Sequence, residues 1–349
     1  MRIFFDIGHP AHVHYFKNLI KTLEKKDHRI LVSARKRYPV FELLKAYKIF
    51  FFSRGAGANS KLGKLFYLIF ADFLLYFKAI SFKPDLLISF GAVYLTHVAK
   101  IIKKPSIFLD DTDNARLNQK FYVPFATHIL TPDIFQYDFG KKHIRFKSYM
   151  ELSYLHPNYF SPNKTIFSVL KLNEDAPYVI LRFVSWTANH DYGHYGISIE
   201  NKMKAVKEFE KYCKVFISSE KPLPLELEKY RIKIPPHMMH DAIAYSKLIY
   251  GESATMASEA AVLGVPAIFI DNDGRCYTTE EENLYGLVYN YSESALDQDA
   301  SIEKGVEILT ADIDYKIKQS KLLKDKIDLT DYLVKFIEGF LTKQSHKLD

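Results

Sequence analysis

The stretch LIYGESATMASEAAVLGVPAIFID, residues 248–271, decides the fold class of this 349-residue chain. It starts with three apolar residues that stop at Gly251, a pattern typical of a short buried strand. Ser253 is a favoured N-cap, and residues 254–263 are rich in strong helix formers with no interior Gly or Pro. The first part of the stretch therefore predicts a strand followed directly by a helix.

The end of the same stretch predicts a second strand. Gly264 can end the helix in a left-handed conformation and Pro266 prevents it from continuing, so the apolar residues 266–270 form the next strand. In parallel sheets, the N-terminus of a helix that follows a strand commonly binds phosphates and nucleotides. Glu252 and Glu259 are about two helical turns apart, so we expect both carboxylates on one face. That face is either part of a nucleotide site or a solvated acidic surface.

Composition limits the classes of protein to which the chain can belong. Its length favours two domains, and 48% apolar residues supply large cores. The net charge of +7 suits phosphate-bearing substrates or an anionic membrane surface, whereas no basic run interleaved with aromatic residues indicates nucleic-acid binding. Cys213 and Cys276 form no CxxC pair, which disfavours a disulfide scaffold or zinc ribbon and fits a reducing cytoplasm. The start, MRIFFDIGHP, lacks a signal-peptide pattern.

Short apolar runs alternate with helical patterns along most of the chain. The runs predicted as strands, besides the two above, are 2–7, 29–33, 49–52, 86–90, 106–109, 127–130, 178–183 and 215–218. The helices predicted between and after them are 13–25, 38–47, 62–80, 94–102, 200–212, 294–309 and 330–341. This alternation predicts an α/β protein with parallel sheets covered by helices on both faces.

The alternation breaks between residues 148 and 177, where Pro and Asn residues mark a connection. We therefore predict two Rossmann-like, doubly wound domains, 1–155 and 156–349, with a last helix that can pack back on the first domain. Two such domains joined by a linker are expected to face each other across a cleft, which is the default place for a ligand.

Three histidines cluster in GHPAHVHY, residues 8–15, where the first strand meets the first helix. His12 is placed to act as a general base at neutral pH or to contact a phosphate at the helix N-terminus. A metal site would need His9, His12 and His14 to converge, but their spacing does not match the helical pairs that bind zinc. We therefore expect no metal, and hydrogen-bonded structural histidines are the alternative to a catalytic role.

The segment LDDTDN, residues 109–114, brings three carboxylates to the end of another strand. Carboxylates in that place can act as a general base, accept hydrogen bonds from sugar hydroxyls or bind magnesium. They can equally cap the next helix, because Asp favours a helix N-terminus. Asp111 is the second candidate base after His12, and Asp110 is the third catalytic candidate.

Turns in the second half carry further candidate ligands. They are Arg182 and Trp186 after one strand, Ser219 and Glu220 after the next, and His237 and Met238 in a turn before the opening stretch. The guanidinium of Arg182 offers a fork of donors to a diphosphate. Trp186 either lines a sugar pocket or packs at a domain interface, and the turn at 237–238 can meet the edge of a base.

A long apolar segment, residues 61–83, carries four lysines among many Phe, Tyr and Leu residues. Its longest apolar window, 65–77, contains Asp72 and spans 13 residues, which predicts that it is too short to cross a bilayer. The segment is either a basic helix against a membrane surface or a core helix with a lysine-bearing face.

Five motifs, by their order and spacing, resemble the domain of unknown function 354 family, which is regarded as GT-B-like. They are HPAHVHYF, YMELSYLHP, LRFVSW, SSEKPLP and GESATMASEAAVLGVP, and they cover nearly the whole chain. The last motif also resembles the nucleotide-sugar site of GT-B glycosyltransferases and UDP-N-acetylglucosamine 2-epimerases. The resemblance implies a GT-B architecture of two Rossmann-like domains.

The same resemblance implies roles for particular residues. Glu259 would hold the ribose hydroxyls, the turn at His237 would meet uracil, and the helix start at 253–256 would meet the diphosphate. The residues implied in nucleotide-sugar binding are Arg182, Ser219, Glu220, His237, Met238, Glu252, Ser253, Ala254, Thr255, Met256 and Glu259. Those expected at the acceptor or the sugar are His9, His14, Asn118, Glu151 and Trp186.

The first domain is also similar to the lipid-linked N-acetylglucosamine transferase of peptidoglycan synthesis. The AHVHY segment, residues 11–15, takes the place of its GGHVFPA-like turn, while Asp110 and Asp111 stand where its HEQN segment has Glu and Gln. The GTRPE-like turn of the epimerases is absent, and residues 182–186 replace their THREN-like segment. The resemblance therefore favours transfer over epimerisation.

Together these patterns predict a metal-independent GT-B glycosyltransferase without a cofactor. It would move a sugar from a nucleotide-sugar donor, expected to be UDP-linked, to a lipid- or polysaccharide-linked glycan acceptor in surface polysaccharide biosynthesis. We expect it in the cytoplasm, at the inner face of the membrane if the 61–83 segment contacts lipid. A 2-epimerase-like enzyme and a non-catalytic sugar-nucleotide-binding protein are the alternatives.

Overall fold

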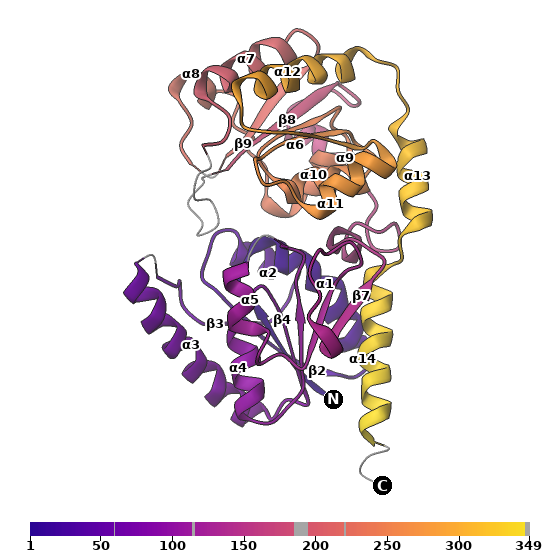
Figure 1. Ribbon diagram of the computed structural model, residues 1–349. Helices are drawn as coiled ribbons and strands as arrows, with labels where there is room; N and C mark the ends of the chain where they lie inside the picture. Colours follow the sequence, from indigo (N-terminus) through magenta and orange to yellow (C-terminus); the bar gives the residue numbers. More distant parts are fainter. Residues whose placement is uncertain (59, 114–115, 185–194, 220, 346–349) are drawn as a thin grey trace. The chain divides into compact units, whose positions relative to one another are not determined.

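The computed structural model describes residues 1–58, 60–113, 116–184, 195–219 and 221–345. The chain divides into two compact units (Figure 1). Unit 1 comprises Met1–Tyr154 and Ile327–Asp349, and unit 2 comprises Leu155–Lys326. The expected domains 1–155 and 156–349 differ from these units by one residue at the linker and by the terminal segment.

The terminal segment, which contains helix α14 (Leu329–Ser345), belongs to unit 1. Leu329, Leu333 and Ile337 follow one face of this helix and are each at most 1% exposed. At its start, Thr330 Oγ1 donates to the carbonyl oxygen of Ser153 at 2.8 Å. The apolar stripe of α14 is therefore buried in the unit that the first 154 residues build.

Unit 1 is built on a seven-stranded parallel sheet with the order β3-β2-β1-β4-β5-β6-β7. The strands are β1 (Arg2–Ile7), β2 (Arg29–Ala34), β3 (Phe52–Ser53), β4 (Leu86–Phe90), β5 (Ser106–Leu109), β6 (His128–Pro132) and β7 (His143–Phe146). The described helices are α1 (Pro10–Lys25), α2 (Val40–Ala46), α3 (Lys61–Phe82), α4 (Tyr94–Ile101), α5 (Arg116–Tyr122) and α14, with 3₁₀ turns η1 (Gly140–Lys142) and η2 (Met150–Ser153).

Helices cover both faces of this sheet, as the alternation predicts. On strand β1, Phe4 lies in a buried cluster with Leu75 of α3 and Leu95 of α4. The next residue, Phe5, points to the opposite face, where its ring centroid lies 5.3 Å from that of Phe16 in α1. Successive side chains of one strand therefore fill two separate cores.

Several boundaries in unit 1 differ from the prediction, and two of them have a direct physical reason. Helix α1 begins at Pro10 rather than at residue 13, because His9 is its N-cap and accepts the N–H of Ala11 at 3.3 Å. The strand expected at 49–52 is reduced to β3, because the N–H of Ile49 bonds to the carbonyl of Leu44 and still belongs to the end of α2. Strand β7 lies in a segment where no strand was predicted.

Unit 2 is built on a five-stranded parallel sheet with the order β12-β11-β10-β8-β9. The strands are β8 (Tyr178–Phe183), β9 (Lys214–Ser219), β10 (Ile249–Gly251), β11 (Ala267–Ile270) and β12 (Val288–Tyr291). The described helices are α6 (Thr165–Val169), α7 (Ile199–Phe209), α8 (Leu225–Glu228), α9 (Met239–Ala244), α10 (Ala254–Val262), α11 (Cys276–Glu280), α12 (Ala295–Thr310) and α13 (Tyr315–Asp325), with the 3₁₀ turn η3 (Pro236–Met238) and the π-helical turn η4 (Glu281–Tyr285).

The strand–helix–strand unit predicted from residues 248–271 is confirmed as β10, α10 and β11. Ser253 is the N-cap of α10, and its Oγ accepts the N–H of Met256 at 3.3 Å. Gly264 ends the helix region with a φ of +71°. At Gly251 an added Cβ would lie 2.0 Å from the carbonyl oxygen of Arg182, so only glycine lets β10 lie against β8.

Helix α3 departs from two expectations drawn from the sequence, the limit on its apolar length and the alternative of a core helix. Residues 62–82 are long and apolar enough to cross a membrane by length and composition, so the 13-residue window underestimates the segment. A core helix with a lysine-bearing outer face is also wrong, because large apolar side chains such as Phe66 and Phe73 lie on the exposed face. The inner face alone packs on the unit.

Candidate functional site

Polar residues gather at the carboxyl edge of the unit 1 sheet, beginning with His12. Its half-buried ring lies 4.9 Å from the ring of Phe90, measured between centroids, and its Nδ1 accepts the N–H of Gly8 at 3.3 Å. Loss of solvent, followed by the nearby His9 and Arg54, lowers the pKa of His12 well below its usual value. The ring is therefore neutral at pH 7. A neutral imidazole has one acceptor nitrogen, so Nδ1 takes that role and Nε2 carries the proton.

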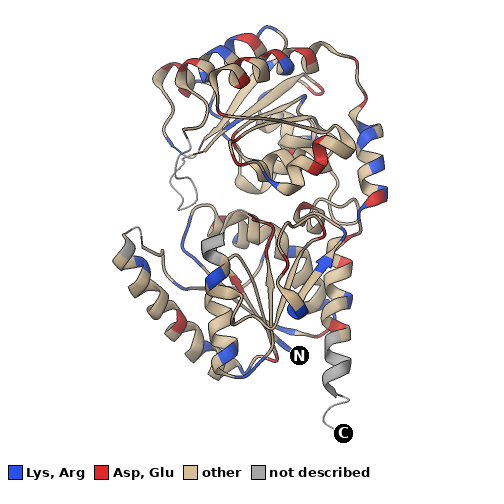
Figure 2. Ribbon diagram, viewed as in Figure 1, with Lys and Arg blue, Asp and Glu red and all other residues tan. Residues whose placement is uncertain are grey.

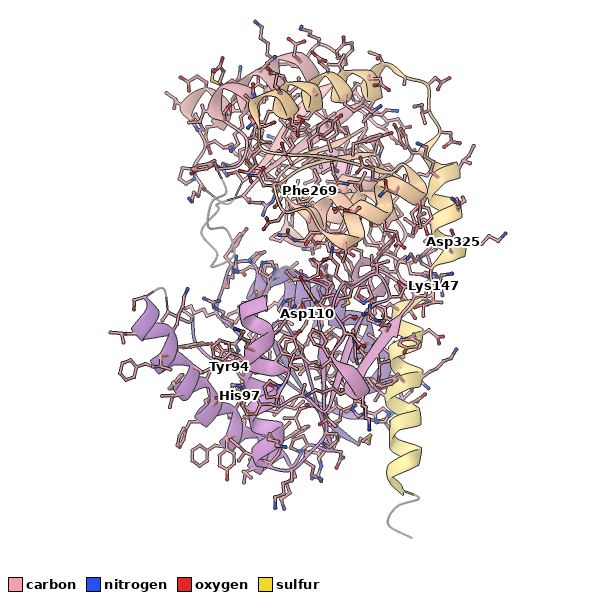
Figure 3. The ribbon with its side chains drawn as sticks, in the orientation of Figure 1. Tyr94, His97, Asp110, Lys147, Phe269 and Asp325 are labelled. Atoms are coloured by element: carbon pink, nitrogen blue, oxygen red, sulfur yellow. The ribbon has the colours of Figure 1, made fainter. Side chains whose placement is uncertain are left out.

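Arg54, which the sequence interpretation missed, lies behind this turn. Its Nε is 2.7 Å from Asp6 Oδ1, and the side chains of Arg54 and Asp6 are 2% and 0% exposed. Nη1 donates to the hydroxyl of Tyr67 at 2.7 Å, and the guanidinium lies 4.6 Å from the centre of the Tyr94 ring (Figure 3). A Cβ on Gly8 would lie 3.2 Å from Arg54 Nη2, so the guanidinium reaches the turn that holds His12.

Two buried oxygens in the same region have no hydrogen-bond partner among the described residues. They are Asp6 Oδ2 and Ser89 Oγ, from register partners on β1 and β4. Ser33 on β2 donates to the other oxygen of Asp6 at 2.7 Å. The sequence signal for this cluster is an arginine that directly follows a strand and precedes the Gly55-Ala56-Gly57 loop.

The two aspartates after β5 have different environments. Asp110 accepts the hydroxyl of Tyr122 at 2.6 Å and the N–H of Thr112 at 3.0 Å, and burial raises its pKa to about 7 (Figure 3). Asp111 accepts the hydroxyls of Thr112 at 3.0 Å and Tyr15 at 3.5 Å. The ring of Tyr15 stacks on that of His12, with centroids 6.2 Å apart. The structure thus links Asp111 to His12 and points Asp110 toward Tyr122.

The residues expected at the acceptor do not all join this group. His9 caps α1, next to the His12 turn. His14 is buried, and its ring stacks on Tyr154 with centroids 5.3 Å apart. Glu151 is buried in η2. The side chain of Asn118 and all of Trp186 lie outside the described residues.

In unit 2, Arg182 and Ser219 lie at the carboxyl ends of neighbouring strands. Arg182 Nη1 donates to the hydroxyl of Ser218, its register partner on β9, at 3.0 Å. Ser219 Oγ donates to the carbonyl of Lys221 at 2.9 Å and so closes the turn that follows. Glu220 lies outside the described residues.

Helix α10 presents its N-terminus at the same edge. Ser253, Ala254 and Thr255 are half-buried. The first N–H groups of a helix have no acceptor within the helix, and here Ser253 Oγ accepts only that of Met256. The resulting partial positive charge favours an anion. Two turns further on, Glu259 Oε1 lies 2.9 Å from Nε2 of His240 in α9. His240 follows the predicted turn of His237 and Met238, which η3 contains, but its own role was not predicted.

Glu252 does not share a face with Glu259, contrary to the prediction. Its Oε2 accepts the N–H of Val184 at 2.8 Å, its Oε1 accepts that of Ile197 at 2.7 Å, and Lys202 Nζ lies 3.1 Å from Oε1. Glu252 precedes the N-cap, so helical periodicity does not set its direction. The carboxylate instead connects the end of β8 to the backbone before α7.

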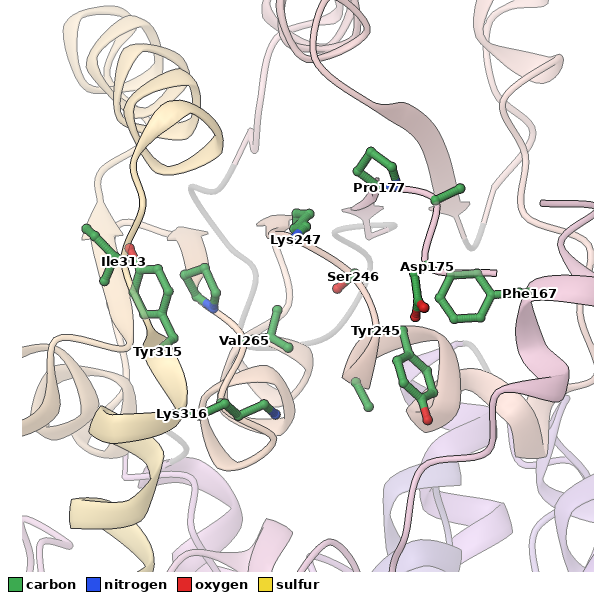
Figure 4. Close-up of a pocket in the computed structure, with 14 residues that line it drawn as sticks. Phe167, Asp175, Pro177, Tyr245, Ser246, Lys247, Val265, Ile313, Tyr315 and Lys316 are labelled. Atoms are coloured by element: carbon green, nitrogen blue, oxygen red, sulfur yellow. The ribbon is translucent and has the colours of Figure 1, made fainter. Parts of the chain in front are cut away.

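A pocket of about 310 Å³ lies at the opposite edge of the unit 2 sheet (Figure 4). Residues 175–177, 246–247 and 264–266 line it, and they precede β8, β10 and β11. The pocket is therefore at the amino ends of the strands, away from Arg182 and Ser253. Among the described residues, no group of three or more His, Cys, Asp or Glu side chains is arranged to hold a metal ion.

Two α/β units with parallel sheets define a GT-B class of fold, as predicted. The chain belongs to the family described as "Protein of unknown function (DUF354)", which matches residues 1–340. It is similar to the uncharacterized protein MJ0665 of Methanocaldococcus jannaschii, with 24% identity over 291 residues, 80% of this chain and 82% of that protein.

Two solved structures illustrate the range of proteins with this fold. The UDP-GlcNAc 2-epimerase from Neisseria meningitidis, bound to UDP-GlcNAc, has a TM-score of 0.71 and 14% identity over 98% of this chain and 100% of its own. The spinosyn rhamnosyltransferase SpnG, complexed with thymidine diphosphate, has a TM-score of 0.62 and 13% identity over 97% and 100%. At these identities the similarity concerns the fold.

Proposed function

We propose that the chain is a metal-independent glycosyltransferase that uses a nucleotide-sugar donor, UDP-linked, and a lipid- or polysaccharide-linked glycan acceptor in surface polysaccharide biosynthesis, acting on the cytoplasmic side of the membrane. Helix α10 carries the proposal. Its N-terminus, capped by Ser253, offers N–H groups to a diphosphate, and Glu259 offers carboxylate oxygens to ribose hydroxyls. That proteins of similar fold bind UDP-GlcNAc or thymidine diphosphate supports this assignment.

In the transfer step, an acceptor hydroxyl attacks the anomeric carbon of the donor and the bond to the diphosphate breaks. Arg182 and the N–H groups of α10 would stabilise the leaving diphosphate without a metal ion. The acceptor proton needs a base, and the sequence ranks His12 ahead of Asp111. Because Gly8 already donates to His12 Nδ1, we now favour Asp111 as the base and His12 Nε2–H as a donor that orients the acceptor oxygen.

Epimerisation at C2 of the donor sugar is a second candidate function. The Neisseria meningitidis epimerase has a higher TM-score than the rhamnosyltransferase, 0.71 against 0.62, which favours this alternative. An epimerase needs no acceptor, whereas a transferase releases nucleoside diphosphate only when an acceptor is present. A non-catalytic protein would bind the donor and do neither.

The experiment begins with a thermal-shift screen of nucleotide sugars, because a ligand of the native state raises its apparent stability. The best donor is then incubated alone in heavy water and, separately, with a panel of lipid-linked and free glycans. Acceptor-dependent release of diphosphate supports the transferase. Deuterium uptake at C2 without acceptor supports the epimerase, and tight binding without turnover supports a binding protein.

Variants test the catalytic assignment. Asp111→Asn is expected to lower transfer by at least about a hundredfold, the usual loss for a missing base, while donor binding is retained. Asp138→Asn, at an exposed position of unit 1, is the control. Full transfer activity in both Asp111→Ala and His12→Ala would overturn the assignment of catalysis to these two residues.

A further inference from the structure

One face of helix α3 exposes a continuous apolar surface, which we call the outer stripe. Its members are Leu62, Leu65, Phe66, Ile69, Phe70, Phe73, Phe77 and Ile80, each between 50% and 72% exposed. Successive members are mostly three or four residues apart and fall within about 140° of the helical wheel. Isolated exposed apolar residues are ordinary, but eight on one helix face indicate a surface that binds another apolar phase.

The opposite face of α3 already packs on unit 1. Leu75 and Ala79 lie in the buried cluster with Phe4 of β1. Asp72 Oδ2 lies 2.9 Å from His97 Nδ1 in α4 (His97 is labelled in Figure 3). The inner contacts therefore fix the orientation of the helix, and the outer stripe faces outward as a consequence.

The exposed charged residues of α3 and its end are of one sign. Asp72 is the only acidic residue in 61–82, and it lies on the inner side. Lys64, Lys78 and Lys83 are exposed along the same helix and at its end. Figure 2 shows α3 as a mainly uncharged helix with basic residues toward its ends. On the helical wheel Lys64 and Lys78 lie about 160–200° from Leu62, on the side away from the outer stripe, and Lys83 follows the end of the helix. A helix with one apolar face and basic residues on its other side matches the interface of a bilayer that contains anionic lipids.

Two other occupants fit these observations less well. A second copy of the chain packed through the same stripe would place two helices of net positive charge side by side, with no carboxylate on either stripe to offset that charge. A membrane-spanning α3 would have to leave the sheet, but only residues 83–85 separate its end from β4, a link of about 10 Å at full extension. The helix end therefore stays at the sheet.

We infer that α3 is a monotopic membrane anchor that lies along the surface of an anionic phospholipid bilayer, with the outer stripe in the acyl boundary and Lys64, Lys78 and Lys83 at the headgroups. This inference does not depend on the proposed function. If that function holds, α3 is also connected to the candidate site. The hydroxyl of Tyr67 in α3 accepts a hydrogen bond from Nη1 of Arg54, and Arg54 reaches the His12 turn. Membrane binding would then bring the residues around His12 and Asp111 close to a lipid-linked acceptor substrate.

The test measures binding of the full chain to vesicles by co-sedimentation. We expect binding to phosphatidylcholine vesicles that contain phosphatidylglycerol, weaker binding to phosphatidylcholine alone, and further weakening at high salt. The triple variant Phe66→Gln, Phe70→Gln and Phe73→Gln removes apolar area from the outer stripe and should lower binding by roughly tenfold or more. The matched control replaces three exposed apolar residues elsewhere, Phe50→Gln, Leu225→Gln and Leu296→Gln, and should bind as the unchanged chain does.

Circular dichroism and thermal melting confirm that both triple variants fold. A second measurement changes a single side chain of the outer stripe. A polarity-sensitive fluorophore on Phe73→Cys should shift to the blue with anionic vesicles, whereas one on Leu225→Cys should not. Equal vesicle binding by the outer-stripe variant and its control overturns the inference. It is also overturned if the chain ignores vesicles and light scattering shows a dimer that the same variant dissociates, or if carbonate at high pH fails to extract the chain from cell membranes.

Discussion

His240 Nε2 lies 2.9 Å from Glu259 Oε1, and this contact joins helix α9 to helix α10 inside unit 2. The side chains are 3% and 7% exposed. A carboxylate in so buried a place needs polar partners, and the imidazole supplies one of them. The contact fixes the orientation of Glu259 two turns after the helix start that we assign to the diphosphate.

The first prediction concerns this carboxylate. Glu259→Gln should raise the Kd for the best nucleotide sugar about tenfold or more, because a hydrogen bond from ribose to a charged acceptor is worth about 1.5–3 kcal/mol. Isothermal titration calorimetry measures the Kd. Glu303→Gln, exposed on α12, is the control and should bind normally. An unchanged Kd in Glu259→Gln removes the residue from the nucleotide site.

The second prediction separates Glu252 from Glu259. Glu252 accepts two backbone N–H groups and pairs with Lys202, so Glu252→Gln should lower the free energy of unfolding of unit 2 by about 2–4 kcal/mol. Urea denaturation followed by fluorescence measures this change, with Glu226→Gln as the exposed control. If Glu252→Gln loses affinity for the donor but no stability, Glu252 is a ligand and its structural role is wrong.

The third prediction concerns the ion pair of Arg54 and Asp6. Arg54→Met leaves the buried carboxylate without its cation and should destabilise the chain by about 3–5 kcal/mol. The double variant Arg54→Met with Asp6→Asn should recover part of that loss, because the unpaired charge is gone. Denaturation of the single and double variants measures the coupling. Strictly additive losses would show that the two side chains do not depend on each other.

The fourth prediction is a pH dependence. Burial raises the pKa of Glu281 from 4.5 to about 8, and its Oε2 has no hydrogen-bond partner among the described residues. Between these values the unfolded chain releases the proton and the folded chain keeps it. The contribution of Glu281 to the free energy of unfolding therefore falls as pH rises through this interval, by at most about 1.4 kcal/mol per pH unit, and is constant above pH 8.

Denaturation at several pH values checks this sign. Glu281→Gln lacks the titrating group, so its stability should fall less steeply than that of the unchanged chain between pH 5 and 8, as expected for a group with a pKa of about 8. Glu303→Gln keeps the buried carboxyl of Glu281 and should show the same dependence of stability on pH as the unchanged chain. Parallel curves for the Glu281 variant and the unchanged chain would mean that this carboxyl is ionised in the folded protein.

The periodicity of apolar residues and the positions of helix caps, Gly and Pro were sufficient to predict most of the fold. Residues 248–271 specify β10, α10 and β11, because Ser253, Gly264 and the apolar runs act through local backbone preferences. The same local signals predicted the α/β class and most strands. They missed β7 and β12 and misplaced the start of α1, where a single cap residue, His9, decides the boundary.

The candidate site was only partly accessible from the sequence. Residues that end strands, such as Arg182 and Asp111, could be proposed because parallel strands bring their carboxyl ends to one edge. Arg54 and His240 could not, because their significance comes from Asp6 and Glu259, partners 48 and 19 residues away. The bond from Gly8 to His12, which favours Asp111 as the base, joins residues only four apart, but it depends on the conformation of the turn between β1 and α1.

The sequence by itself determined the α/β class, the strand–helix–strand unit around Ser253 and the family resemblance, because each depends on neighbouring residues in the chain. Only the tertiary structure decided that Glu252 accepts the N–H groups of Val184 and Ile197, that Arg54 lies behind the His12 turn, and that α3 has two apolar faces of which one stays exposed. These features depend on which distant residues bury a side chain, satisfy its hydrogen bonds or leave it uncovered, and no local pattern carries that information.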